Sequence, residues 1–148
     1  MNLGQMFLVM LALIMLSTFL LSLYTNLMGQ MDISVRNLYF SQAVKIAENE
    51  FQKYEAWIIG QVLTFYQVYD TLRSGIDLEP VNIEGTAYHV NISSHLTNSI
   101  GINVFTPTSD YQRIDVRVRI VSGNREFYVG ENHSALSMVL SRLELEPL

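Results

Sequence analysis

The chain has 148 residues, of which 49% are hydrophobic and 16% charged, and its 14 acidic and 9 basic side chains give a formal net charge of -5. The acidic balance disfavours a nucleic-acid partner, because phosphates call for a basic surface. The absence of cysteine excludes a disulfide framework, a thiolate nucleophile and a Cys-based zinc site.

The N-terminal segment, residues 1–31, contains no Asp, Glu, Lys or Arg. Within it, residues 6–28 are mostly Leu, Met, Ile, Phe and Val, interrupted by small polar residues such as Thr18 and Ser22. A helix needs about 20 such residues to cross a bilayer core. A single small domain could hardly enclose an apolar helix on all sides. We therefore predict a transmembrane or filament-core helix over residues 1–31.

The apolar segment differs from a cleaved secretory signal. It lacks both the basic start and the A-x-A-like end of such a signal, and it is longer than the usual apolar region. We expect a retained anchor that places the protein in a membrane. Its orientation is weakly specified, because Arg36 and Lys45 after the anchor are interleaved with Asp32 and Glu48.

A stripe of apolar residues with helical spacing follows the anchor. Its members are Phe40, Val44, Ala47, Phe51, Tyr54, Ile58, Val62, Phe65, Tyr69 and Leu72. We expect an amphipathic helix over residues 32–74, with a flexible joint at residues 29–32, a kink at Gly60 and an end at Gly75. Part of the stripe should pack on the C-terminal domain and the rest on neighbouring chains, which makes Phe51 and Ile58 candidate assembly contacts.

From residue 76 the apolar period changes to two. The pattern predicts an edge strand around Pro80, strands at residues 88–92, 100–104 and 113–120, and a hairpin turn at residues 122–124 that leads into a strand at residues 127–129. The tail, residues 134–145, fits a short helix or a strand, and we expect the helix.

Strands in succession imply an antiparallel sheet over residues 75–148 that needs a cover on its apolar face. The long N-terminal hydrophobic and amphipathic helix can supply that cover. The predicted fold class is therefore α+β, with this helix packed on a small antiparallel β-sheet.

The strand at residues 113–120 carries a basic face. Arg113, Arg117 and Arg119 alternate with apolar residues and share their face with Asp115, and Arg125 follows closely. One interpretation is a docking patch for an acidic surface, such as that of a neighbouring copy. The other is a solvated sheet face whose arginines pair with cross-strand carboxylates.

No pattern of catalytic or ligand-binding residues stands out. His89, His95 and His133 lack metal-ligand spacing, and no Gly-rich phosphate loop follows a strand. Two glycosylation sequons begin at Asn91 and Asn132, and because about one would arise by chance, the signal is weak. We expect a protein that is not an enzyme, with no cofactor, metal, small-molecule substrate or nucleic acid.

An uncharged N-terminal hydrophobic helix that continues into an amphipathic helix and a small antiparallel sheet resembles the type IV pilin and pseudopilin superfamily. In that family a prepilin peptidase cuts after a glycine, and Gly4-Gln5 before the apolar run is similar to such a site. The family's basic leader and its glutamate at the fifth mature position are not matched. That position is Val9 after cleavage at Gly4, or Gln5 if Met1 is the mature start.

The resemblance implies a structural subunit of a pilus-like surface filament. Its partners would be copies of itself in a helical filament, and it would be membrane-anchored before assembly and at the cell surface afterwards. Thr18 and Ser22, four residues apart on one helix face, should then meet a neighbouring helix, and Gln5 a neighbour's terminal amine. The alternative is a single-pass membrane-anchored accessory subunit of an envelope complex that binds a partner through its sheet domain.

Overall fold

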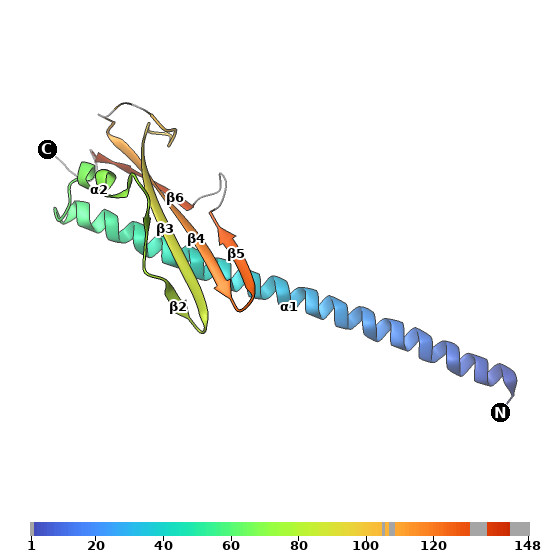
Figure 1. Ribbon diagram of the computed structural model, residues 1–148. Helices are drawn as coiled ribbons and strands as arrows, with labels where there is room; N and C mark the ends of the chain where they lie inside the picture. The colour runs from blue at the N-terminus through green and yellow to red at the C-terminus, as the bar shows by residue number, and fades with distance from the viewer. Residues whose placement is uncertain (1, 105, 107–108, 131–135, 143–148) are drawn as a thin grey trace. The chain divides into compact units, whose positions relative to one another are not determined.

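A computed structural model describes residues 2–104, 106, 109–130 and 136–142 of the chain, which divides into two compact units, Met1–Tyr39 and Phe40–Leu148. Its elements are α1 (Leu3–Ile59), α2 (Phe65–Leu72), β1 (Ile76–Asp77), β2 (Val81–Ile83), β3 (Thr86–Thr97), β4 (Tyr111–Ser122), β5 (Arg125–Val129) and β6 (Leu136–Ser141) (Figure 1). A long N-terminal helix with a six-stranded antiparallel sheet confirms the predicted α+β class.

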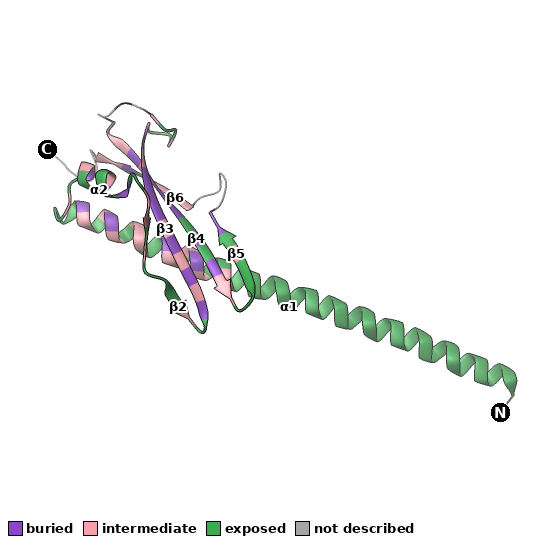
Figure 2. Ribbon diagram, viewed as in Figure 1, coloured by how far each residue is buried: buried purple, intermediate pink, exposed green. Residues whose placement is uncertain are grey.

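The first unit consists of α1 alone. Every described residue from 2 to 38 is exposed, as the continuous green ribbon in Figure 2 shows. Judged by length and composition, α1 is long and apolar enough to cross a membrane, and it is the one such helix in the described part of the chain. The helix does not break at the joint expected at residues 29–32, because α1 continues through Gly29. The cost of about 1 kcal/mol for one glycine does not end a helix of this length.

The amphipathic helix expected over residues 32–74 is interrupted, and the kink expected at Gly60 is a complete break. Gln61 has a positive φ of 56°, which ends α1. Helix α2 starts at a capping box, in which the Thr64 hydroxyl accepts from the Gln67 amide at 3.3 Å and the Gln67 side chain accepts from the Thr64 amide at 2.8 Å. Thr-x-x-Gln is the sequence signature of a helix start, so the break could have been predicted. The end of α2 before Gly75, whose φ is 76°, is confirmed.

In the second unit, α1 from residue 40 onward lies across one face of the sheet (Figure 1). The small side chains of Ala43 and Ala47 are buried there, and the Tyr88 hydroxyl of β3 donates to the Gln42 side chain of α1. Most of the apolar core comes from α1, α2, β3 and β4, and β5 and β6 add one residue each: Ala43, Ala47, Tyr54, Ile58, Phe65, Val68, Leu72, Tyr88, Val90, Ile92, Leu96, Ile114, Val116, Val118, Ile120, Val129 and Leu140. Burial of each large apolar side chain stabilises this unit by about 1.5–3 kcal/mol.

The sheet is built around one long pair of strands. β3 and β4 pair from Ala87↔Val121 to Thr97↔Tyr111. The edge strand expected around Pro80 is confirmed as two short strands, β1 and β2, which both pair with β3. The hairpin turn between β4 and β5 is also confirmed, with Gly123 at a φ of 58°.

Two expected elements have another structure. Residues 98–102 form a loop rather than a strand, because the Asn98 side chain accepts from the backbone amides of Ile100 at 3.2 Å and Ile102 at 2.9 Å. At the end of the expected strand, Asn103 forms an isolated antiparallel bridge with Thr97, and the Val104 amide donates to the Leu96 carbonyl at 2.9 Å. The helix expected in the tail is wrong over residues 136–141, where β6 pairs with β4 from Tyr111↔Ser141 to Val116↔Leu136. The other tail residues, 134–135 and 143–145, lie outside the described residues.

Candidate functional site

The first candidate site is the uncovered apolar surface of α1. Large exposed side chains lie around its whole circumference through the bilayer-length segment: Met6, Phe7, Leu8, Val9, Met10, Leu11, Leu13, Ile14, Met15, Leu16, Phe19, Leu20, Leu21, Leu23, Leu27 and Met28. An amphipathic helix of a globular protein has one apolar stripe, whereas this one is apolar on all sides. Such a surface needs lipid or other helices around it.

The exposed apolar surface continues beyond the length that a bilayer requires. Ile33 is 61% exposed, Leu38 52% and Phe40 54%, and Val35 is also exposed. On a helix, residues 33 and 40 share one face, while residues 35 and 38 lie near the opposite face. Four large apolar side chains within residues 33–40 therefore remain uncovered on two faces of the helix.

Several small polar residues of the apolar segment 6–28 donate hydrogen bonds within their own helix. The Thr18 hydroxyl donates to the backbone carbonyls of Ile14 at 3.1 Å and Met15 at 2.9 Å, and Ser17 donates to Leu13 at 2.8 Å. Back-bonding of this kind satisfies the donor in apolar surroundings and leaves the oxygen able to accept. Ser22 is exposed, like Thr18. The Thr18 hydroxyl oxygen could therefore accept a hydrogen bond from a donor on a neighbouring helix.

The candidate processing site lies in the first turn of α1. Gly4 has open space around it, since an added Cβ would meet no atom within 4 Å. The Gln5 side chain accepts from the backbone amide of Asn2 at 3.3 Å, which is one half of a capping box. A bond from Gln5 to a neighbour's terminal amine would compete with this local one.

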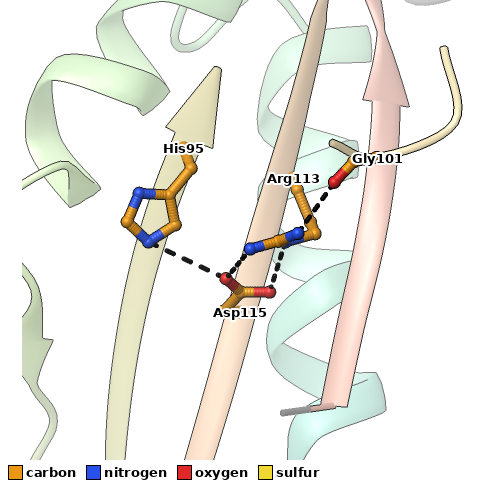
Figure 3. Close-up of polar contacts among 4 residues, drawn as sticks. All are labelled: His95, Gly101, Arg113 and Asp115. Carbon is orange, nitrogen blue, oxygen red and sulfur yellow. Dashed lines mark hydrogen bonds and ion pairs between the residues drawn. The ribbon is translucent and has the colours of Figure 1, made fainter. Parts of the chain in front are cut away.

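The second candidate site is a polar cluster on the face of the sheet opposite the helix. Arg113 donates from Nε to Asp115 Oδ1 at 2.8 Å, from Nη2 to Asp115 Oδ2 at 3.0 Å, and from Nη1 to the Gly101 carbonyl at 2.7 Å (Figure 3). His95 Nε2 on the neighbouring strand lies 3.8 Å from Asp115 Oδ2. The Asp115 side chain is 5% exposed and that of Arg113 is 27% exposed, so this bidentate pair is partly shielded from water.

Sequence reasoning missed this cluster as a unit. The sequence already placed Arg113 and Asp115 on one face of the strand, but the arginines of this face were expected to pair with carboxylates of neighbouring strands rather than of their own. The register that brings His95 beside them, and the loop fold that brings the Gly101 carbonyl, come only from the tertiary structure.

The other arginines of the basic face have looser surroundings. Arg119 is exposed and lies 3.9 Å from Glu126 Oε1 on the adjacent strand. Arg117 is exposed, and within the described part of the chain its side chain makes no hydrogen bond or ion pair. Because Asp115 neutralises Arg113, the positive charge open to a partner is that of Arg117 with Arg119.

The remaining candidates are tied into the second unit. Ile58 is fully buried in its core, and Phe51 is half-buried. Asn91 lies within β3 and donates to Asp77 Oδ1 at 2.8 Å, while Asn132 and His133 lie outside the described residues. The described residues contain no group of three or more His, Asp or Glu that could hold a metal ion.

Searches of protein-family models, curated proteins and solved structures give no match to this chain. The resemblance to the pilin superfamily therefore rests on architecture. A long apolar N-terminal helix whose C-terminal part packs on an antiparallel sheet is compatible with that superfamily.

Proposed function

We propose that this chain is a structural subunit of a pilus-like surface filament, assembled through its hydrophobic N-terminal helix. The observation that carries the proposal is the exposed apolar surface at residues 33–40, which lies beyond the bilayer-length segment. A lone membrane anchor would leave Ile33, Leu38 and Phe40 in water. A bundle of helices from other copies would cover both faces of this stretch.

The division of the chain into two units fits this role. The second unit has its own buried core and does not need the first for its packing. The first is free to join a bundle through contacts between different surfaces of successive copies, which is the geometry that generates helical filaments. Before assembly the same helix would hold the subunit in the membrane, and after assembly the subunit would lie at the cell surface.

Electron microscopy of sheared surface material, with immunogold labelling of this chain, tests the proposal. We expect labelled fibres from cells with the parent chain. An Ile33→Ser/Phe40→Ser double variant should still resist carbonate extraction from membranes, because residues 6–28 are intact, but should give few or no fibres. An Ile59→Ser/Val62→Ser variant is the matched control, because both side chains are exposed elsewhere in the chain.

A parent chain found only in monodisperse membrane complexes would contradict the filament and favour a single-pass accessory subunit. Intact mass adds a separate test of processing. A mature chain that starts at Gln5, or an N-methylated first residue, supports the pilin-like pathway, whereas an unmodified or formylated Met1 supports the accessory subunit.

The polar face of the anchor gives a finer test of the same bundle. Replacing Thr18 and Ser22 together with leucine should leave membrane insertion intact and weaken assembly by about 1 kcal/mol per contact. We expect the low end of the known range because the Thr18 hydroxyl already donates within its own helix. The critical concentration for fibre formation measures this effect, and an unchanged value would show that the face makes no polar contact.

A further inference from the structure

Two columns of opposite charge lie on the face of the sheet that points away from α1. The basic column is on β4, where the exposed Arg117 and Arg119 alternate with buried apolar residues. The acidic column begins at Asp77 of β1 and continues at Glu79, and both of these side chains are exposed. β3 lies between the columns, with α1 on the opposite side of the sheet (Figure 1). This face is therefore basic on one side of β3 and acidic on the other.

The strand register places the first charge of each column in one row. Asp77 pairs with Asn91, and Asn91 pairs with Arg117, so the three residues form a line across β1, β3 and β4. Their side chains share a face, because Asn91 Nδ2 donates to Asp77 Oδ1 at 2.8 Å and cross-strand partners point the same way. Asn91 separates the two charges, and within the described part of the chain Arg117 makes no ion pair.

The second charge of each column lies in the next row. Arg119 pairs with His89 on β3. On the other side of β3 the Leu78 amide still donates to a β3 carbonyl at 2.9 Å, which brings the following residue, Glu79, beside His89 on the face of Asp77. β1 and β4 are both antiparallel to β3 and therefore run in the same direction. Both columns thus take the same step of two residues, about 7 Å, in the same direction.

We infer that this face binds the same face of a second copy, about a two-fold axis that runs along β3, parallel to the strands. The rotation places the basic column of each copy opposite the acidic column of the other and keeps every row at its height. Arg117 then faces Asp77 of the second copy, and Arg119 faces Glu79 of the second copy. Because a two-fold contact is made twice, the interface contains four ion pairs and no like charges in opposition.

Other carboxylates of a second copy match the basic column less well. Glu48 and Glu55 on α1 are seven residues apart, about 10.5 Å along the helix, whereas Arg117 and Arg119 are about 7 Å apart. The two-fold arrangement also suits anchored chains. A rotation about an axis parallel to the strands leaves their direction unchanged, so both copies can have their anchors in one membrane.

The contact goes beyond the proposed function and does not depend on it, because it uses the face of the sheet that α1 leaves free. Exposed ion pairs stabilise a complex by only about 0–1 kcal/mol each. The contact is therefore weak between dilute molecules. Two chains anchored in the same membrane meet at a much higher effective concentration, at which a weak contact becomes populated.

Single-cysteine crosslinking of the full chain in membranes tests the contact, since the chain has no cysteine of its own. His89 lies at the axis, and stacked sheets are about 10 Å apart, so His89→Cys should give dimers with a bismaleimide of about that length. Tyr128→Cys is the matched control. Tyr128 is 51% exposed on the same face, but it lies two strands from β3, which leaves its two copies about 20 Å apart along the sheets.

Charge reversal in the His89→Cys chain tests the complementarity. Arg117→Glu/Arg119→Glu makes the face acidic throughout, and Asp77→Lys/Glu79→Lys makes it basic throughout. Each variant alone should crosslink at least about tenfold more slowly, which corresponds to about 1.4 kcal/mol over four ion pairs. The two variants expressed together should recover the parent rate, because an acidic face then meets a basic one. All four side chains are exposed, so the midpoint of unfolding should stay that of the parent.

The inference is overturned by equal crosslinking at residues 89 and 128, by rates that ignore both charge reversals, by no recovery in the mixture, or by crosslinks to another protein. Fibres without the dimer would overturn this inference and leave the proposed function standing. Dimers in membranes of cells that form no fibres would do the reverse.

Discussion

Within the single helix α1, the residues of the Met1–Tyr39 unit and those of the Phe40–Leu148 unit are stabilised in different ways. In the first unit α1 is apolar all round over residues 6–28 and buries no described side chain. In the second it buries one face, through Ala43, Ala47, Tyr54 and Ile58. Most helical stability comes from packing of a buried face, so the second part is supported by its own sheet. The first part depends on lipid or on other chains.

The largest contrast between the units should come from core truncation. Ile114→Ala in the second unit removes a fully buried side chain and should lower the free energy of unfolding by about 3 kcal/mol. Leu16→Ala in the first unit should change it by less than about 0.5 kcal/mol, because Leu16 is exposed. Urea unfolding of the full chain in detergent micelles, followed by fluorescence of the single tryptophan, Trp57, measures both. Equal losses would show that the units unfold as one.

A second comparison separates the two kinds of ion pair on the sheet. Asp115→Ala leaves the Arg113 guanidinium partly buried without its carboxylate and should cost about 2 kcal/mol. Arg119→Ala disrupts only an exposed pair at 3.9 Å and should cost less than about 0.5 kcal/mol. The same unfolding assay applies. A cost for Asp115→Ala as small as that for Arg119→Ala would mean that the cluster does not stabilise the unit.

A gain of stability should come from the inner face of the sheet. Gln112 is fully buried between the strands and the helices, and its side-chain amide has no hydrogen-bond partner in the described part of the chain. Gln112→Met keeps the length of the side chain and removes two polar atoms, so the free energy of unfolding should rise by about 1 kcal/mol. Gln52→Met, at an exposed position on α1, is the matched control and should have no such effect. A loss of stability in Gln112→Met would reveal a bond that the amide makes in solution.

The smallest effect concerns pH. Burial raises the pKa of Tyr54 above its usual 10.0, and the carboxylate of Glu50 raises it further. The folded state therefore favours the neutral phenol, and the stability that this provides is present below pH 10 and lost as the pH rises through the folded pKa. Between about pH 8 and about pH 11 the parent should lose more stability than Tyr54→Phe, in parallel unfolding curves. If the parent and Tyr54→Phe lost the same stability over this pH range, the pH dependence would come from groups other than Tyr54.

Much of the fold followed from local periodicity. The spacing of three and four predicted helix from residue 40 to residue 72 but missed the break between α1 and α2. The alternation at Ile114, Val116, Val118 and Ile120 correctly placed their side chains on the buried face of β4. The turn at Gly123 was predictable because a glycine suits its positive φ. Such features depend on neighbours within a few residues, which a sequence shows directly.

Other features depended on partners far along the chain. Ile100 and Ile102 alternate like a strand, but the Asn98 side chain and the Arg113 guanidinium fold their segment into a loop. The residue pattern of the tail fits a helix as well as a strand. Pairing with the edge of β4 makes residues 136–141 the strand β6. The sequence by itself determined the charge-free apolar segment of residues 1–31 and the helical and strand periods. Only the tertiary structure decided which apolar residues stay uncovered and which polar residues meet, because burial and hydrogen bonding depend on distances in space that a sequence does not contain.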